Sequence, residues 1–268
     1  MTPFHKADVW VSSRLPIAIQ RDGQESAFSP ITCTLIHGTT EAVLVDTPIS
    51  IAQAEELIHW IEETAPSISL KYIYITHGHG DHYQLRPKTI DHVWLRFFPG
   101  NQIYQPQQTA EAWQSDVFTV EGHECRIIEV GHSDTHDTTV LYVPDLRLVV
   151  AGDVVYGDVH QFFGEANTTA KRAEWLRALD TTESLDPHIV IARHKRPGGV
   201  DGVFNVQTTR EYIMSFEGAV KETSGPMELY TKMQSLFLWR INPHAILAGA
   251  MAAFGQDAYE FGQKSSWI

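Results

Sequence analysis

The chain has 268 residues, 43% of them hydrophobic, and its 33 acidic and 20 basic residues give a formal net charge of −13. The length suits a sizeable hydrophobic core, and the negative charge would repel a polyanion, so we expect no nucleic-acid partner. No run approaches the roughly 20 apolar residues that span a bilayer, and the N-terminus lacks the apolar segment of a signal peptide. We therefore expect a cytoplasmic protein without a membrane partner.

Short apolar runs separated by turn signals predict several strands in the first third of the chain. The opening residues are expected to form a hairpin or two short strands. The expected strands cover residues 7–20, 31–36, 41–45 and 71–76. Ser50 is expected to cap a helix that runs to about Thr64. The strand that ends at Thr76 is rich in Ile and Tyr, which predicts a buried strand.

The rest of the chain alternates short strands with helices. Strands are predicted at residues 117–120, 125–130, 139–143, 148–151 and 189–192, and helices at 83–98, 169–179, 207–223, 226–239 and 243–254. Cys33 and Cys125 fall in strand-like runs, so we expect two buried free thiols rather than a disulfide. No linker interrupts the sequence, which favours a single domain over residues 1–268 with a core at about 7–200. The apolar C-terminal helices, at 205–256, are expected to pack on that core and to form a pocket wall or a homodimer interface.

The segment directly after the strand at 71–76 concentrates histidines and an aspartate. These residues are His77, His79, Asp81 and His82, and two glycines lie between them. Glycine lets the chain bend tightly, so consecutive side chains can be aimed at one point. Imidazole and carboxylate are ligands for zinc and also suit iron, nickel and manganese. The segment therefore predicts a metal site.

Three later polar residues share this context, because each lies just past the end of a short apolar strand. They are His132, Asp153 and His194. Loops at the same strand ends gather at one edge of a sheet, so we expect these side chains to join the histidine-rich segment. His136 lies in the same polar loop as His132 and is a rival ligand. We favour His132, which directly follows the strand, and expect His136 to support the ligands or to be exposed.

The order of these motifs resembles that of the metallo-β-lactamase-fold hydrolases over about residues 31–195. The shared pattern is a strand followed by H-x-H-x-D-H, then Gly-His, Gly-Asp and a last His. The resemblance implies an α/β fold, a four-layer αββα sandwich of two mixed β-sheets flanked by helices, with metals at one edge. Two divalent ions are implied, zinc first, with manganese or iron as alternatives.

The same resemblance implies a role for each ligand. His77, His79 and His132 would hold one metal, Asp81, His82 and His194 the second, and Asp153 would bridge both. Asp46 would support the metal loop without binding metal itself. Two positions depart from the family pattern. Arg193 stands where relatives usually have Gly and is expected to narrow the pocket or to pair with an anion, and Ser-Asp-Thr-His replaces the usual Thr-Pro-Gly after His132.

The implied chemistry is hydrolysis by a metal-bridging hydroxide, with Asp81 passing the proton to the leaving group. Tyr156 matches a tyrosine that hydrogen-bonds the substrate carbonyl in lactonases of this fold, although a packed tyrosine without a role fits equally well. His160, Phe162, Phe163 and Arg193 are expected to line the pocket. The acidic surface favours a small neutral substrate, so we expect a lactamase or lactonase that opens a cyclic amide or ester. A benzoxazolinone-type xenobiotic, and hence a role in detoxification, is the narrower hypothesis.

Other activities of the same fold remain as alternatives. A mononuclear iron persulfide dioxygenase keeps similar ligands, and a thioester hydrolase of the glyoxalase II type shares the site. A di-iron oxygen reductase is disfavoured, because His79 stands where those proteins have Glu and no flavodoxin module fits the length. A non-catalytic metal-binding protein is disfavoured by the intact ligand set.

Overall fold

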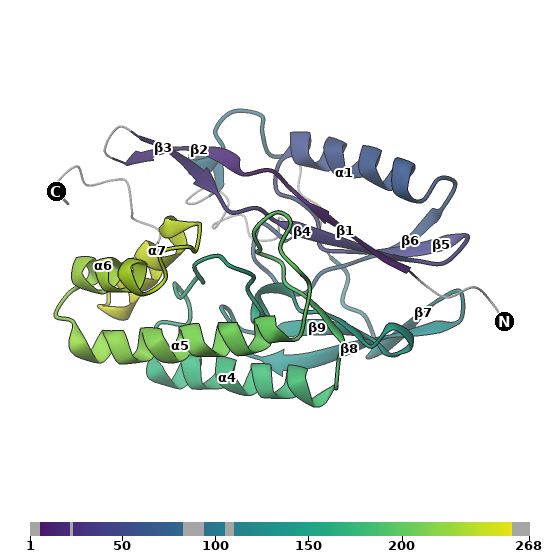
Figure 1. Ribbon diagram of the computed structural model, residues 1–268. Coiled ribbons are helices and arrows are strands. Elements are labelled where there is room, and N and C mark those ends of the chain that lie inside the picture. Colours follow the sequence, from purple (N-terminus) through teal and green to yellow (C-terminus); the bar gives the residue numbers. More distant parts are fainter. Residues whose placement is uncertain (1–5, 22–23, 83–93, 105–109, 259–268) are drawn as a thin grey trace.

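The computed structural model describes residues 6–21, 24–82, 94–104 and 110–258. Within these residues, two mixed β-sheets face each other and helices cover their outer sides (Figure 1). The layers run in the order helix, sheet, sheet and helix. The predicted α/β fold, a four-layer αββα sandwich, is confirmed.

The first sheet has four strands in the order β1-β4-β5-β6. They are β1 (Lys6–Val11), β4 (Thr32–His37), β5 (Glu41–Val45) and β6 (Ser69–Tyr74). β5 and β6 run parallel, whereas the other neighbours are antiparallel. A parallel pair needs a crossover, and helix α1 (Ile51–Thr64) supplies it while covering the outer face of the sheet.

The central strands of this sheet are apolar on both faces, because each face packs against a different layer. In β5, Leu44 is buried in the cluster that contains Leu57 of α1. Its neighbour Val43 is buried in the cluster between the two sheets, beside Leu141. This alternation explains why the strand is a continuous apolar run in the sequence.

The second sheet has five strands in the order β11-β10-β9-β8-β7. They are β7 (Val117–Val120), β8 (His123–Gly131), β9 (Thr138–Val143), β10 (Leu148–Val150) and β11 (Ile189–Ile191). β7 and β8 form an antiparallel hairpin, and its turn residues Glu121 and Gly122 both have positive φ, 49° and 85°. Such backbone angles match the twist of a two-residue hairpin. β10 and β11 are parallel, and helix α4 (Thr169–Ser184) joins them.

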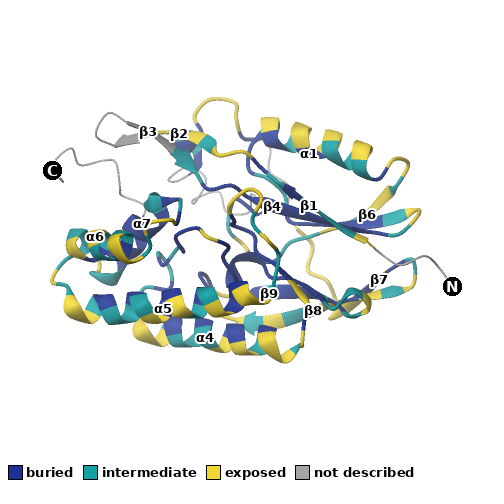
Figure 2. Cartoon of the chain, viewed as in Figure 1, coloured by how far each residue is buried: buried dark blue, intermediate teal, exposed yellow. Residues whose placement is uncertain are grey.

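Three C-terminal helices complete the outer layer on the second sheet: α5 (Phe204–Glu222), α6 (Pro226–Leu236) and α7 (Pro243–Ala253). One buried cluster contains Trp175 of α4, Phe216 of α5, Met233 of α6 and Ile246 of α7. Figure 2 shows the same pattern as dark blue inner faces and yellow outer faces on α4 and α5. No described helix has both the length and the apolar content needed to cross a bilayer.

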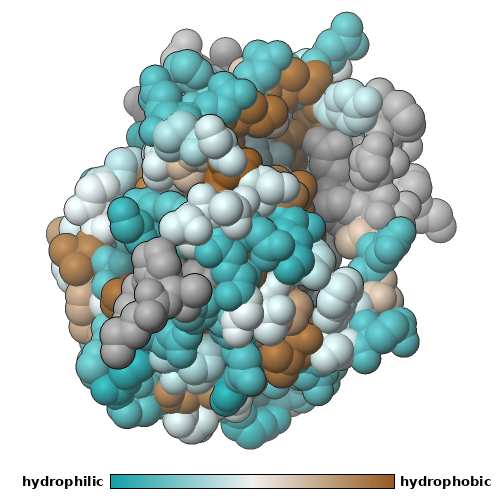
Figure 3. All heavy atoms as spheres, turned by 90° about the vertical axis from the view of Figure 1, so that its right-hand side faces the viewer, coloured by the Kyte–Doolittle hydropathy of each residue, from teal (hydrophilic) through white to brown (hydrophobic). Residues whose placement is uncertain are grey.

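Hydrophilic side chains predominate on the face at the β7 end of the molecule, and the apolar ones form separate groups (Figure 3). This agrees with the formal charge of −13. The two cysteines lie in the interior: both Cys33 and Cys125 are buried and free, as predicted. Burial raises the pKa of the Cys33 thiol to about 11, so it stays protonated at neutral pH.

Three expectations about the elements need correction or limits. Of the two forms expected for residues 7–20, two short strands are confirmed and the hairpin is wrong, because β1 pairs with β4 while β2 (Leu15–Arg21) pairs with β3 (Gln24–Phe28). The buried strand expected up to Thr76 ends at Tyr74 and lies at a sheet edge, where Ile73 is 53% exposed. Of the helix expected at 83–98, residues 83–93 lie outside the described residues, and α3 (Leu95–Phe97) is the part that remains.

The predicted cap of α1 gives a direct test of the local structure. Ser50 Oγ accepts a hydrogen bond from the backbone N–H of Gln53 at 3.2 Å. We expect Ser50→Ala to lower the free energy of unfolding by about 1 kcal/mol, since this N–H would lose its partner. Urea unfolding followed by circular dichroism measures the change. Ser235→Ala is the control, because Ser235 is exposed and only donates to Thr231 O within α6; equal losses in both variants would contradict the capping role.

Candidate metal site

Four loops at one end of the sandwich bring the polar residues together. The first, residues 77–82, follows β6, and the second, residues 132–137, follows β8. Asp153 lies in a short 3-10 turn after β10, and His194 follows β11. Every one of these loops leaves the C-terminal end of its strand, which is the arrangement expected from the sequence.

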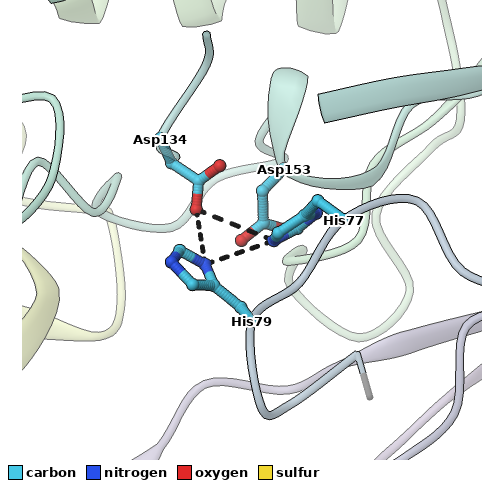
Figure 4. Close-up of side chains that lie close together, drawn as sticks. All are labelled: His77, His79, Asp134 and Asp153. Carbon is cyan, nitrogen blue, oxygen red and sulfur yellow. Dashed lines mark hydrogen bonds and ion pairs between the residues drawn. The ribbon is translucent and has the colours of Figure 1, made fainter. Parts of the chain in front are cut away.

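The first of two side-chain clusters contains His77, His79, Asp134 and Asp153, and Figure 4 shows these side chains pointing toward one another. His77 Nε2 lies 3.2 Å from His79 Nδ1. Asp134 Oδ2 lies 3.0 Å from the same His79 atom and 3.9 Å from His77 Nε2. One ligand atom from each residue therefore faces a common point.

The second cluster contains Asp81, His82 and His194. His194 Nε2 lies 3.0 Å from Asp81 Oδ2. Asp153 connects the two clusters, because its Oδ1 lies 3.4 Å from His82 Nε2 and its Oδ2 lies 3.4 Å from His194 Nε2. The carboxylate thus lies between the two clusters, and the bridging role that the sequence resemblance implied stays a prediction.

Both clusters fit divalent cations. Ligand atoms at 2.0–2.1 Å from a tetrahedral ion are about 3.3 Å apart, and most of the separations above are close to this value. Three buried atoms in the clusters also lack a hydrogen-bond partner within the described residues: His82 Nε2, Asp134 Oδ2 and Asp153 Oδ1. Buried polar atoms without partners cost free energy, and a bound cation would remove that cost.

The charges in the site depend on one another. Burial alone would lower the pKa of His194, but the carboxylates of Asp153 and Asp81 raise it to about 10. Burial likewise opposes ionisation of Asp153, but His194 and His82 hold the pKa of its carboxyl well below the usual range. His77 differs, because burial and the neighbouring His82 and His79 lower its pKa. Without metal, the site is an ion-pair network, and metal binding must displace protons from it.

Asp46 supports the second cluster without joining it. It follows β5 with φ 60°, and its Oδ1 accepts a hydrogen bond from the backbone N–H of Thr76 at 2.9 Å. Its Oδ2 lies 3.0 Å from His82 Nδ1, so the other ring nitrogen of His82 faces the cluster. A carboxylate in this position fixes the tautomer and the orientation of an imidazole ligand.

The two glycines of the metal loop, residues 77–82, have different structural roles. A Cβ atom on Gly80 would clash with the indole Nε1 of Trp94, whereas a Cβ on Gly78 would meet nothing within 4 Å. Gly80 is therefore required by packing, and Trp94 fixes that side of the loop. Gly78 contributes only chain flexibility.

The second loop departs from the expected ligand set. His132 is buried, but its Nδ1 donates to Ser133 O at 2.7 Å and the residue belongs to neither cluster. Asp134 from the same loop takes part instead, and the ligand role of His132 stays a prediction. His136 lies at the surface, where its 53% exposed side chain pairs with Asp137. In the sequence, Asp134 is marked only by its place two residues after His132, in the Ser-Asp-Thr-His segment that departs from the family pattern.

Glu165 is a further residue that the sequence reasoning missed. Its Oε1 lies 3.2 Å from His79 Nε2, and its Oε2 accepts a hydrogen bond from Thr135 Oγ1 at 2.6 Å. Lys171 Nζ donates to its backbone oxygen. The carboxylate therefore contacts the ring nitrogen of His79 that faces away from the cluster. Glu165 lies 86 residues from His79 in the sequence, so no local pattern connects the two.

A cavity opens beside the two clusters, and Tyr156 and Phe162 lie in its wall. The hydroxyl of Tyr156 donates to Asp153 Oδ2 at 3.0 Å. Burial and the charge of Asp153 raise the pKa of Tyr156 well above 10, so the hydroxyl keeps its proton.

Three other residues expected in the pocket are placed elsewhere. Phe163 stacks on Phe216 in the core, and His160 Nδ1 pairs with the hydroxyl of Tyr212. Arg193 is buried, and its guanidinium donates to the backbone oxygens of three residues rather than to the cavity. These residues are Thr32, Thr47 and Asp81. The expectation that Arg193 narrows the pocket is therefore wrong, because the side chain turns toward the core, where loop carbonyls need donors.

Comparison with known proteins agrees with this geometry. A family profile described as the metallo-β-lactamase superfamily matches residues 27–83, which include the histidine-rich loop. The chain is 29% identical over 174 residues to the lactamase-like protein notP of Aspergillus sp. (strain MF297-2). That match covers 62% of this chain and 51% of the relative, so the chain spans about half the length of the curated relative it matches.

Solved structures of metallo-β-lactamases share the fold. A metallo-β-lactamase family protein of Thermus thermophilus matches with a TM-score of 0.61 and 16% identity, covering 92% of this chain and 93% of that one. A metallo-β-lactamase from Pontibacter korlensis has a TM-score of 0.55 and 18% identity, with 79% and 99% covered. The FIM-1 enzyme of Pseudomonas aeruginosa, in its mono-zinc form, has a TM-score of 0.53 and 17% identity, with 78% and 91% covered.

The contact between Glu165 and His79 can be tested by metal binding. Glu165→Gln keeps the size of the side chain but replaces the carboxylate with a neutral amide. We expect the metal affinity of the His77/His79 cluster to fall about 10- to 100-fold, as for other carboxylates that orient a ligand histidine. Competition with a chromophoric chelator measures it, and Glu174→Gln, whose side chain is 45% exposed on α4, is the control. Unchanged affinity in the Glu165 variant would show that His79 is oriented without the carboxylate.

Proposed function

We propose that this chain, a member of the metallo-β-lactamase fold superfamily, is a dinuclear metal-dependent hydrolase that opens a neutral cyclic amide or ester. The family expected from the motif order is confirmed by the profile match, the curated relative and the shared fold. The observation that carries the proposal is the position of Asp153, with one carboxylate oxygen beside each of two buried ligand clusters. A single metal would not need a carboxylate between two sets of ligands.

The lining of the cavity supports a neutral substrate. Its walls are mostly apolar, and the described residues that line it include neither lysine nor arginine. An anionic substrate would find no lysine or arginine among these lining residues, and the net charge of −13 would repel it. The curated relative is named lactamase-like, which supports a lactam or a lactone as the scissile ring. A benzoxazolinone-type compound, which is a neutral cyclic carbamate, belongs in the same class.

The bound cations supply a water acidified toward neutral pH and Lewis acidity at the substrate carbonyl. The protein then handles the proton. Asp81 lies in the cavity wall, and hydrogen bonding with His194 keeps the pKa of its carboxyl below the usual range despite burial. As the new C–O bond forms, a carboxylate oxygen of Asp81 accepts the proton. It then delivers the proton to the ring nitrogen or oxygen as the scissile bond breaks.

Tyr156 is the side chain assigned to the carbonyl oxygen. Its protonated hydroxyl lies in the cavity wall and donates to Asp153 Oδ2 in this structure. Turning that donor toward the substrate would stabilise the negative charge that develops on the oxygen. Zinc is the proposed metal, since the imidazole and carboxylate donors suit it and one fold relative is described in a mono-zinc form. Manganese and iron suit the same donors.

Several expectations stay predictions. They are the single domain, the cytoplasmic location, the role in detoxification, the homodimer and the lack of nucleic-acid and membrane partners. None of them is needed for the chemistry above.

Metal content and ring opening together test the proposal. We expect the purified chain to carry close to two zinc or manganese ions and to hydrolyse at least one member of a neutral panel of lactones, lactams and benzoxazolinone. Plasma emission spectrometry measures the metals, and product chromatography follows the ring opening. One iron per chain with oxygen uptake on a persulfide would instead identify the dioxygenase, and hydrolysis confined to thioesters would identify the glyoxalase II type.

Loss of a ligand tests the site itself. We expect Asp153→Ala or His79→Ala to lower kcat at least about a thousandfold, because metals contribute several kcal/mol to the transition state. The fold should remain, as judged by circular dichroism. His136→Ala is the matched control, since this histidine is at the surface and should keep full turnover. Full turnover in either ligand variant would contradict the assignment of the site.

A further inference from the structure

The cavity beside the metal clusters extends beyond the ligands to Phe28, Phe162 and helix α7. Counted together with the open solvent at its mouth, the space is about 680 Å³. Two buried carboxylate oxygens without a hydrogen-bond partner among the described residues, Asp134 Oδ2 and Asp153 Oδ1, belong to residues that line it. The reacting end of the cavity is therefore polar, and the question is what occupies the rest.

One wall is aromatic and comes from the N-terminal half of the chain. Phe28 of β3 lies in this wall with Trp94 and Phe97. The ring of Phe28 is edge-on to Trp94, at 5.5 Å between centroids, and to His194, at 5.9 Å. These contacts fix the ring directly beside a residue of the second metal cluster, so an apolar surface begins where the ligands end.

The other wall is formed by Phe162 and helix α7, which lies on the same side of the molecule as the β2–β3 hairpin (Figure 1). The ring of Phe162 is edge-on to His79, at 5.8 Å between centroids. Ala245 and Ala248 of α7 also face the cavity. Residues three apart lie on the same face of a helix, so these two short side chains leave a continuous open strip.

The position of α7 is fixed by packing on the far side of the cavity wall. A Cβ atom on Gly249 would lie 2.8 Å from Phe163 Cβ, so only glycine permits this close approach. Phe163 is itself held in the core, where its ring stacks on Phe216 at 4.0 Å. The consecutive residues Phe162 and Phe163 thus have different tasks: one faces the cavity and the other anchors the helix that bounds it.

We propose that the substrate carries an apolar ring system beyond the scissile ring, that this part lies against Phe28, Phe162 and α7, and that Ala245 and Ala248 set its size limit. The inference rests on the proposed function for the reaction and on the cavity alone for the binding. The walls offer rigid apolar contact, and burial of apolar area against them favours binding. A larger side chain at position 248 would occupy the same space as the ligand.

The test uses three ligands with the metal-loaded protein. Two are γ-butyrolactone and its benzo-fused analogue 2-coumaranone, and the third is indole, a neutral bicycle without a hydrolysable bond. We expect Ala248→Phe to raise KM for 2-coumaranone and Kd for indole at least tenfold while KM for γ-butyrolactone changes less than threefold. Ala248→Leu should give a smaller shift in the same direction. Steady-state kinetics and calorimetry provide the readouts.

Two controls separate the size limit from damage to the fold. Ala253→Leu places the same side chain as Ala248→Leu on α7 but outside the cavity lining. It should leave KM for 2-coumaranone and Kd for indole unchanged. Phe162→Ala removes a wall and should weaken indole binding while metal content stays the same. Equal effects of Ala248→Phe on the large and small lactones, or no binding of indole to the parent protein, would overturn the inference and leave the hydrolase proposal standing. If the parent protein binds indole, Ala248→Phe loses this binding and neither protein hydrolyses a lactone, the result would support the size limit in the cavity and overturn the proposed reaction.

Discussion

The structure depends on a buried network of opposite charges. Seven ionisable side chains, His77, His79, Asp81, His82, Asp134, Asp153 and His194, form two adjoining clusters beneath the surface. A lone buried charge would be very costly, and these groups are tolerated because each imidazole faces a carboxylate. Several atoms of the network nevertheless lack hydrogen-bond partners among the described residues. Such atoms face the imidazoles of the clusters, so a metal bound there would replace an ion pair between ligands rather than a hydrogen bond to the scaffold.

The surrounding scaffold holds this network in place with groups that do not bind metal. Asp46 orients His82, and Glu165 contacts His79, so an imidazole of each cluster is held from behind by a carboxylate. Arg193 holds the backbone of two loops in place, because its guanidinium donates to the carbonyls of Thr47 and Asp81. These carbonyls belong to the loops after β5 and β6. Arg193 thus ties the end of β11 to the metal loop.

Local sequence patterns predicted the fold and most of the site because they reflect local physics. The apolar strands and the Ser50 cap each follow from short-range geometry. The remaining features depend on contacts between distant segments. Nothing in the sequence tells which of Phe162 and Phe163 faces the cavity, since that depends on where α7 docks. Arg193 was misplaced for the same reason: its partners lie 112 to 161 residues away.

The residues that carry out the chemistry and the residues that would determine substrate specificity come from different parts of the fold. The metal ligands come from loops at the ends of sheet strands, where the rigid sheet fixes them. The cavity walls come from the β2–β3 hairpin, α3, Phe162 and α7, which pack on the sandwich from outside. Side chains such as Ala248 can therefore change without moving a ligand, because α7 is held by Gly249 against Phe163 and not by the metal loops. A fold arranged in this way can keep one hydrolytic site while the helix beside it determines which ring system reaches it.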